Sequence, residues 1–195
     1  CARLKSSFAR LCVILFPELE KLVPSLHMVS VYALLAEFPN ARAVSECHLT
    51  RLANLLSQAS KGRYSKDKAI EIRNAAKVSI GSYSEVKSLE LQQTLQLIQV
   101  MEEQIAQADA KISPIVDSFH SPIMTIPGIG YRMAAIIIAE TENFTNFDKA
   151  EKVLAFAGLE PSVYQSGQLT STHAKMVKRG SKYLRYALFN SAKFV

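Results

Sequence analysis

The chain has 195 residues, of which 49% are hydrophobic and 21% are charged. This length and apolar content suit one ordinary domain or two small ones, and they exclude a wholly disordered chain. No apolar run approaches the roughly 18 to 20 residues that a membrane span requires, so we expect no membrane segment. The sequence starts at Cys1, with neither an initiator methionine nor a leader peptide, and we therefore expect a piece of a longer protein.

The cysteines and histidines argue against a disulfide framework and against a metal site. Cys1, Cys12 and Cys47 cannot all pair, and this odd count favours a reducing, cytoplasmic setting. The four histidines are too scattered along the sequence for metal-ligand spacing. We therefore predict no metal ligands within this chain.

The basic residues are concentrated near the carboxyl end. Residues 1–160 contain 17 lysines and arginines and 17 acidic residues, whereas no acidic residue follows Glu160. This cluster is either a solvated basic face or a binding site for a polyanion within the last 35 residues. The whole net charge of +6 comes from Lys175, Lys178, Arg179, Lys182, Arg185 and Lys193.

The hydrophobic periodicity predicts a mainly α fold, since no stretch alternates with period two for long. In residues 1–81, short amphipathic helices are separated mostly by prolines, and we assign this helical linker segment to packing. In the last of these helices we expect Ile70, Ala76 and Ile80 to point inward. The helices are expected over residues 8–16, 29–38, 49–59 and 67–80.

A long amphipathic helix is predicted over residues 82–119. Ser82 and Glu85 have the spacing of a capping box, in which a hydroxyl and a carboxylate satisfy first-turn amides. Either a partner within the chain or a second chain covers its apolar stripe, and we favour a self-associating coiled coil and hence a homo-oligomer. The stripe consists of Leu91, Leu95, Ile98, Met101, Ile105, Ala108, Ile112 and Ile115.

The sequence around Pro127 has the pattern of a helix-hairpin-helix motif. Gly128 and Gly130 alternate with apolar residues and precede a helix rich in alanine and isoleucine. Glycines permit a tight turn and a close approach of the backbone to a ligand, and a helix begins there with free amide groups. The motif is either a phosphate-binding site, to which Arg132 would contribute, or an ordinary helix connection.

A further helix is expected over residues 146–157. Asn146 is placed to cap its start, and Gly158 is placed to end it before a proline. We expect its apolar side chains to point inward as scaffold. These are Val153, Leu154 and Phe156.

Ser166 lies next to a glycine in a loop near Pro161, and is a candidate nucleophile or simply a turn residue. A serine hydroxyl is a weak nucleophile unless a base, a metal or a positive field activates it. Lys178, Arg179 and Arg185 offer such a field, because they can neutralise a phosphodiester. Arg179 and Arg185 do not share one helical face, so both reach one phosphate only if the chain turns at Gly180.

These motifs occur together in one order, and the order resembles a known family. The sequence from 122 to 193 is similar to the carboxyl-terminal domain of the DEDD insertion-sequence transposases, which include the Piv/MooV invertases and recombinases guided by a bridge RNA. The matching motifs are the turn at 126–130, Phe147, the segments 157–161 and 165–167, and the basic segment 178–185. The long helix resembles the coiled-coil region of that family more weakly.

The resemblance implies an enzyme that rearranges DNA. Such proteins join a RuvC-like domain, whose four acidic residues hold a divalent metal such as Mg²⁺, to a domain with a serine that attacks the DNA backbone. Ser166 matches that serine, and Lys175, Lys178, Arg179, Lys182 and Arg185 fall in or beside the basic segment expected to contact DNA or a guide RNA. The acidic tetrad is missing, so we expect residues 1–195 to be a truncated piece that neither cleaves nor joins DNA alone.

Two other functions compete with a transposase fragment. One is a non-enzymatic module that grips DNA or RNA through the hairpin at Gly128 and Gly130 and the basic residues. The other is a scaffold in which the long helix serves dimerisation. The division we expect is a linker at 1–81, a long helix at 82–119, and a truncated carboxyl-terminal domain with the hairpin at 120–195.

Overall fold

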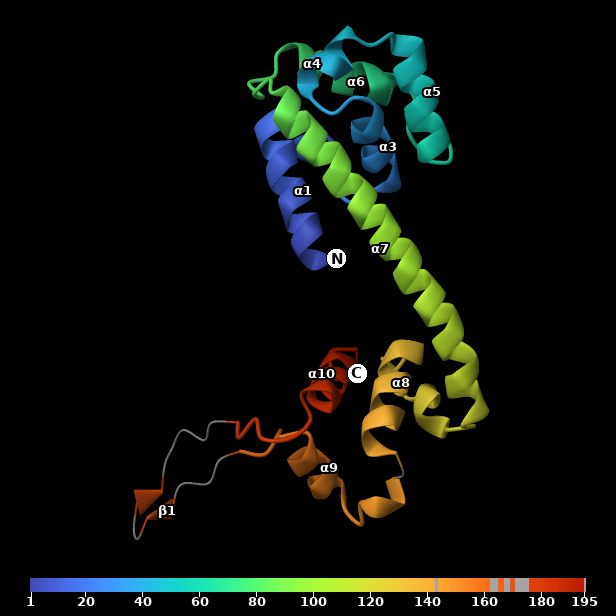
Figure 1. Ribbon diagram of the computed structural model, residues 1–195, viewed down its shortest axis with the longest axis vertical. Helices are drawn as coiled ribbons and strands as arrows, with labels where there is room; N and C mark the ends of the chain where they lie inside the picture. Colours follow the sequence, from blue (N-terminus) through green and yellow to red (C-terminus); the bar gives the residue numbers. More distant parts are fainter. Residues whose placement is uncertain (143, 162–164, 167–168, 171–175, 195) are drawn as a thin grey trace. The chain divides into compact units, whose positions relative to one another are not determined.

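The computed structural model shows a mainly α protein, which confirms the predicted fold class (Figure 1). It describes residues 1–142, 144–161 and 176–194, together with the backbone of 165–166 and 169–170. The chain forms two compact units, Cys1–Ile105 and Ala106–Val195, so the boundary lies inside one long helix. None of the helices in the described ranges is long and apolar enough to cross a membrane.

The first unit consists of six helices and the first part of a seventh. Predicted helices at 29–38 and 49–59 agree closely with the structure, because a clear apolar periodicity and a proline or glycine mark their ends. The two shortest helices had no periodic pattern long enough to predict them. The elements are α1 (Ala2–Leu15), α2 (Leu19–Leu22), α3 (Val29–Glu37), α4 (Ala41–Glu46), α5 (Leu49–Ala59), α6 (Lys66–Lys77) and α7 (Glu85–Ser118).

The prediction for α6 was wrong about its end and partly wrong about its inward face. The helix ends at Lys77, and Ile80 lies beyond it with 88% of its surface exposed. Ile70 is also exposed, whereas Ala69, Ile72 and Ala76 are buried. The inward face thus follows the small alanines, which allow α6 to pack closely against α4 and α5.

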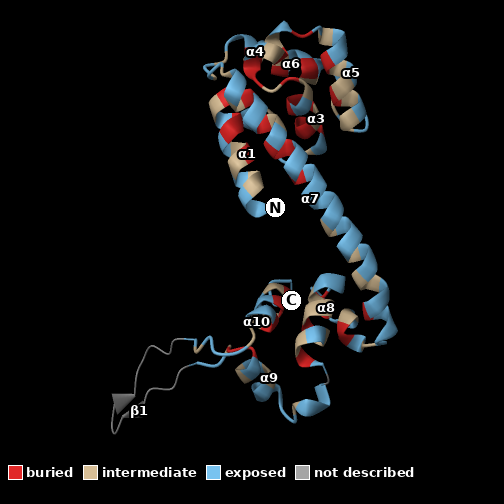
Figure 2. Ribbon diagram, viewed as in Figure 1, coloured by how far each residue is buried: buried red, intermediate tan, exposed pale blue. Residues whose placement is uncertain are grey.

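The first unit has one continuous apolar core (Figure 2). Polar contacts hold the start of α7 against this core: Asn40 donates to Ser88 at 2.9 Å, and Gln92 donates to the Ala36 carbonyl at 2.7 Å. Lys5 of α1 pairs with Glu102 of α7 at 2.6 Å, and the two helices lie side by side. The largest fully buried side chains are Phe8, Leu11, Leu15, Phe16, Leu19, Leu34, Leu35, Leu52, Leu56, Ile72, Leu91 and Leu95.

The start of α7 differs from the predicted capping box. Ser84, not Ser82, caps the helix, and its hydroxyl accepts from the Lys87 amide at 3.3 Å. The Ser82 amide instead donates to the Ile14 carbonyl at 2.8 Å, so tertiary pairing with α1 holds Ser82 outside the helix. Glu85 accepts from the Tyr83 hydroxyl at 3.1 Å.

The stripe on α7 is covered by the chain itself over its first half. Leu91, Leu95 and Ile98 are buried in the core of the first unit, as expected of a core helix rather than of a coiled-coil seam. Further along, Met101 and Ile115 are exposed, so the stripe is not one continuous buried seam. Self-association through residues 82–119 stays a prediction.

The second unit begins with the last turns of α7 and contains three further α-helices. A small apolar core joins α7, α8 and α10, and α8 packs against α10. Its elements after α7 are η1 (Pro122–Thr125), α8 (Tyr131–Thr141), η2 (Phe144–Asn146), α9 (Ala150–Phe156), β1 (Gln165–Ser166), β2 (Leu169–Thr170) and α10 (Lys182–Ser191). The two strands pair antiparallel, with Ser166 opposite Leu169.

The prediction for α9 was wrong at its start and partly wrong about its inward face. Asn146 ends a 3₁₀ turn, and α9 begins at Ala150 after Lys149. The first turn is delayed because the backbone at Phe144–Asn146 folds into its own tight turn. Val153 packs on the core as expected, whereas Leu154 and Phe156 are exposed.

Truncation of Leu95 tests the assignment of α7 to the core of the first unit. We expect Leu95→Ala to lower the free energy of unfolding by about 2 to 5 kcal/mol, because a fully buried leucine leaves a cavity. Leu97 lies on the same helix but is 54% exposed. Leu97→Ala should therefore change the free energy of unfolding by less than about 0.5 kcal/mol. Urea denaturation followed by circular dichroism measures both, and equal losses would contradict the assignment.

Candidate active site and nucleic-acid interface

Backbone pairing joins the two ends of the segment that contains Ser166. The Lys178 amide donates to the Gly158 carbonyl at 3.1 Å, and the Val177 amide donates to the Glu160 carbonyl at 3.0 Å. The Ser181 amide closes the same arrangement by donating to the Phe156 carbonyl at 2.8 Å. We call residues 156–161 and 176–181 the paired stems. They fix both ends of residues 162–175 at one place.

Two glycines allow the paired stems to approach this closely. Gly158 has φ +66°, and a Cβ there would collide with the Arg179 carbonyl oxygen. Gly180 has φ +116°, and a Cβ there would collide with the Phe156 carbonyl oxygen. Positive φ and steric contact both require glycine at these positions. The helix-ending role predicted for Gly158 is confirmed. The chain also bends at Gly180, where a turn would be needed for Arg179 and Arg185 to reach one phosphate.

Side chains from α8 and α10 hold the paired stems in place. Arg185 of α10 is half-buried, and its Nη1 donates to the Ala157 carbonyl at 2.8 Å. The Ser181 hydroxyl donates to Glu140 Oε2 of α8 at 2.5 Å and accepts from the Leu184 amide at 2.9 Å. Ser181 therefore caps α10 and links it to α8 at the same time.

The predicted basic residues divide into two groups in the structure. Lys178, Arg179 and Lys182 are exposed, and Lys178 adopts φ +55° within the second stem. Arg185 is instead bonded within the chain. Lys175 and the hydroxyl of Ser166 lie outside the described part of the structure, so its distances do not test their expected proximity.

The turn predicted at Pro127 is present. Gly128 has φ +83°, and a Cβ there would lie 2.6 Å from the Ser191 carbonyl oxygen, so α10 requires glycine at this position. Gly130 has an ordinary backbone conformation at the N-cap of α8, and its missing Cβ would meet no described atom within 4 Å. A 3₁₀ turn, η1, precedes the hairpin. Phosphate binding here stays a prediction.

Arg132 in the first turn of α8 is paired with an acidic residue of α7. Its Nε donates to Asp109 Oδ1 at 2.7 Å, and its Nη2 contacts Asp109 Oδ2. The hydrogen bond from Arg132 lowers the pKa of Asp109 below its ordinary value, and the same bond raises the pKa of Arg132. Both side chains are accessible, so a phosphate reaching Arg132 would compete with Asp109 in solvent.

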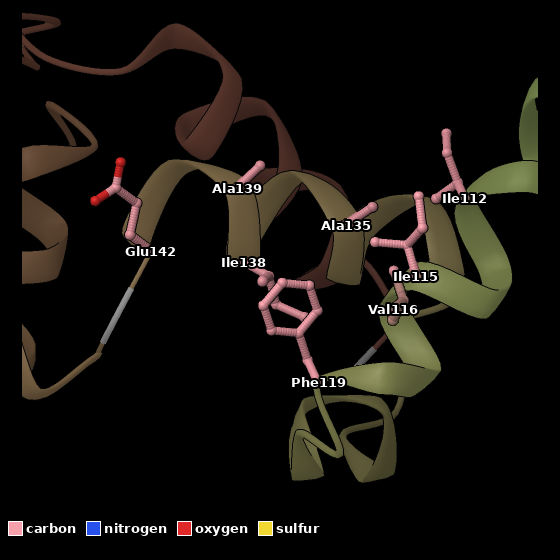
Figure 3. A pocket seen from close by; sticks show the side chains of 8 residues that line it. All are labelled: Ile112, Ile115, Val116, Phe119, Ala135, Ile138, Ala139 and Glu142. Atoms are coloured by element: carbon pink, nitrogen blue, oxygen red, sulfur yellow. The ribbon is translucent and has the colours of Figure 1, made fainter.

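The second unit also has an apolar cavity of about 440 Å³ between α7 and α8 (Figure 3). Glu142 contributes the one carboxylate among its lining residues. The remaining wall is aliphatic and aromatic, so we assign no reaction to this cavity. Its other lining residues are Ile112, Ile115, Val116, Phe119, Ala135, Ile138 and Ala139.

No group of three or more histidine, cysteine, aspartate or glutamate side chains in the described ranges is arranged to hold a metal ion. Cys12 is buried, and burial raises the pKa of its thiol to about 12, so it is an inert thiol.

Comparison with known proteins shows that the second unit is similar to part of a transposase family. Residues 120–195 match the model of the IS116/IS110/IS902 transposase family. The match covers the turn at Gly128, the paired stems and α10.

A curated relative supports the same connection. The chain is 34% identical over 93 residues to an uncharacterized 43.6 kDa protein of insertion element IS110 from Streptomyces coelicolor. This alignment covers 46% of the chain and 22% of the relative, so the chain spans about a fifth of that protein's length. No solved structure matches the chain.

Three residues at this site were missed by sequence reasoning. Asp109, Glu140 and Ser181 bond to residues that lie 23, 41 and 41 positions away, respectively. No short-range pattern signals such pairs. Ser181 followed a glycine before an apolar helix, and this N-cap signal could have identified it as the start of α10.

Replacement of Gly158 tests the close approach of the paired stems. We expect Gly158→Ala to lower the free energy of unfolding by about 2 to 5 kcal/mol, because it adds steric overlap to the strain of a positive φ. Gly62 also has positive φ, but no described atom lies within 4 Å of its missing Cβ. Gly62→Ala should therefore lower the free energy of unfolding by only about 1 to 2 kcal/mol. Calorimetry measures the stability of both variants, and hydrogen exchange of the Lys178 amide reports on the stems. Equal losses of stability in the two variants would contradict the prediction.

Neutralising Asp109 tests whether it competes for Arg132. We expect Asp109→Asn to tighten duplex DNA binding and to steepen the log-log salt slope by about one, because Arg132 becomes available to phosphate. Asp117→Asn removes an equal charge from α7 but leaves the Arg132 pair intact, so it should not steepen the slope. Fluorescence anisotropy at several salt concentrations measures both variants. Weaker binding by Asp109→Asn would show that Asp109 instead orients Arg132.

Proposed function

We propose that this chain is part of a DNA transposase or site-specific recombinase, and that it acts on DNA phosphodiesters through Ser166. The supporting observation is that the family match, residues 120–195, includes the hairpin and the paired stems that flank Ser166. The share of the relative that is aligned is consistent with a larger parent protein. We place that parent in the cytoplasm, where its DNA substrate is found.

The proposed step transfers a DNA phosphate to serine. The Ser166 oxygen bonds to phosphorus as the phosphorus bond to one deoxyribose oxygen breaks, which leaves a phosphoserine ester. The proton lost by the hydroxyl balances the proton gained by the leaving oxygen. Lys178 and Arg179 are exposed at the paired stems and would neutralise the phosphate during attack. Arg185 holds the stems through the Ala157 carbonyl.

We propose that the remaining parts of the site lie outside residues 1–195, in the parent protein and in its partners. A divalent metal, expected to be Mg²⁺, does not fit the described residues, which contain no suitable ligand cluster. We therefore assign it to a RuvC-like domain elsewhere in the parent protein, and derive no step through it. A guide RNA and a second copy of the chain, associating through residues 82–119, are further proposed partners.

A binding module without catalysis is the second candidate function. It is favoured by the pairing of Arg185 with the Ala157 carbonyl, because this bond leaves one cation fewer to neutralise a phosphate at Ser166. In this alternative, Gly128, Gly130 and the exposed cations grip the nucleic-acid backbone, and Ser166 is a turn residue. The two functions predict different effects of removing the Ser166 hydroxyl on strand transfer.

Removal of the Ser166 hydroxyl in the full-length protein separates the two functions. We expect Ser166→Ala to reduce strand transfer and the covalent protein–DNA adduct by at least about 10³-fold, because the nucleophile is lost. DNA affinity should stay within about twofold, since a neutral hydroxyl adds little to phosphate binding. Denaturing gels measure the adduct, and anisotropy measures affinity.

Ser118→Ala is the matched control for this variant. It removes an exposed hydroxyl of the same unit that bonds only the Ile115 carbonyl, so transfer and binding should both be retained. An equal loss of binding and transfer by Ser166→Ala would contradict the nucleophile and favour the binding module.

A further inference from the structure

The outer face of α10 exposes a row of aromatic rings. Tyr183, Tyr186 and Phe189 are 56%, 57% and 57% exposed, and they follow one another at intervals of three residues. This interval places neighbouring rings on one side of a helix. The opposite side contains Leu184 and Ala187, which are buried in the core of the second unit (Figure 2).

Cations flank this aromatic row at both ends. The Lys182 ammonium lies 4.9 Å from the centroid of the Tyr183 ring, and the Lys193 ammonium lies 4.7 Å from the centroid of Phe189. No acidic residue follows Glu160 in the sequence. Lys182 and Lys193 form no ion pair in the described part of the chain. Exposed rings beside such cations fit a ligand that has both flat faces and phosphates.

We propose that this face of α10 binds an unpaired DNA strand, with bases stacked on the rings and phosphates near Lys182 and Lys193. Stacking on aromatic side chains together with a basic track is how proteins bind single strands without reading their sequence. The choice of DNA over RNA rests on the proposed function, whereas the stacking itself follows from α10.

The spacing of the rings favours an unpaired strand over a duplex. Three residues of helix rise about 4.5 Å, whereas successive bases on one strand of B-DNA are about 3.4 Å apart. Successive bases can meet successive rings only if the strand is unstacked and extended. A closed duplex hides the base faces, so it can use the cations but not the rings. A protein partner could pack against the rings. It would use the flanking cations only if it carried acidic groups.

Replacement of Tyr186 in the 195-residue chain tests the proposal. The probe is a labelled 20-nucleotide oligothymidylate, compared with an abasic strand of equal length that keeps the phosphates. We expect Tyr186→Ala to weaken oligothymidylate binding about 5- to 150-fold, which corresponds to one stacked base, and to leave binding of the abasic strand within about twofold. Tyr186→Phe should keep most of the affinity, because the ring remains.

Tyr83 provides the matched control. It is 55% exposed in the first unit and also has a cation beside its ring, since Arg42 lies 4.9 Å from the centroid. Tyr83→Ala should leave oligothymidylate binding unchanged. Far-UV circular dichroism checks that each variant keeps its helices, and Phe189→Ala repeats the test at a second ring if Tyr186→Ala fails to fold.

Several outcomes would overturn the proposal. Unchanged oligothymidylate affinity in Tyr186→Ala and Phe189→Ala would remove the stacking role, as would equal loss on the abasic strand. Binding of oligouridylate without oligothymidylate would exclude DNA as the ligand. Dimerisation that depends on Tyr186 without any oligonucleotide binding would assign the face to a protein contact. These results are independent of the Ser166 adduct, so failure of either proposal is visible without the other.

Discussion

The close backbone contact between residues 156–161 and 176–181 is the constraint on which the candidate site depends. Both stems approach so closely that neither Gly158 nor Gly180 has room for a side chain. The amide and carbonyl groups brought together there bond to each other, which satisfies polar groups that would otherwise be stranded between helices. The two stems lie on either side of Ser166 in the sequence.

The charged residues of the second unit serve two different purposes. Arg185 stabilises the stems from within, because its guanidinium satisfies a carbonyl next to a tight turn. Lys178, Arg179 and Lys182 face solvent, where long-range attraction to a polyanion is available. Arg185 therefore stabilises the stems, whereas Arg179 faces solvent, and the difference in burial separates the two arginines.

Helix α7 shows how tertiary packing changes the meaning of an amphipathic pattern. Its apolar stripe has the periodicity of a coiled coil, yet Leu91, Leu95 and Ile98 pack on helices of their own chain. The intramolecular partners are local in space but far apart in sequence, so the pattern alone cannot distinguish them from a second chain. The position of the cap at Ser84 has a similar cause, since Ser82 is used by α1.

Local patterns in the sequence predicted the helical class, the bounds of α5 and nearly those of α3, the turn at Gly128, and the concentration of positive charge near the carboxyl end. These follow from local periodicity, backbone freedom and composition, which act over a few residues. Only the tertiary structure decided that Arg132 faces Asp109 and that Arg185 supports the stems. Such pairs join residues more than 20 positions apart, and their geometry exists only after the helices have packed.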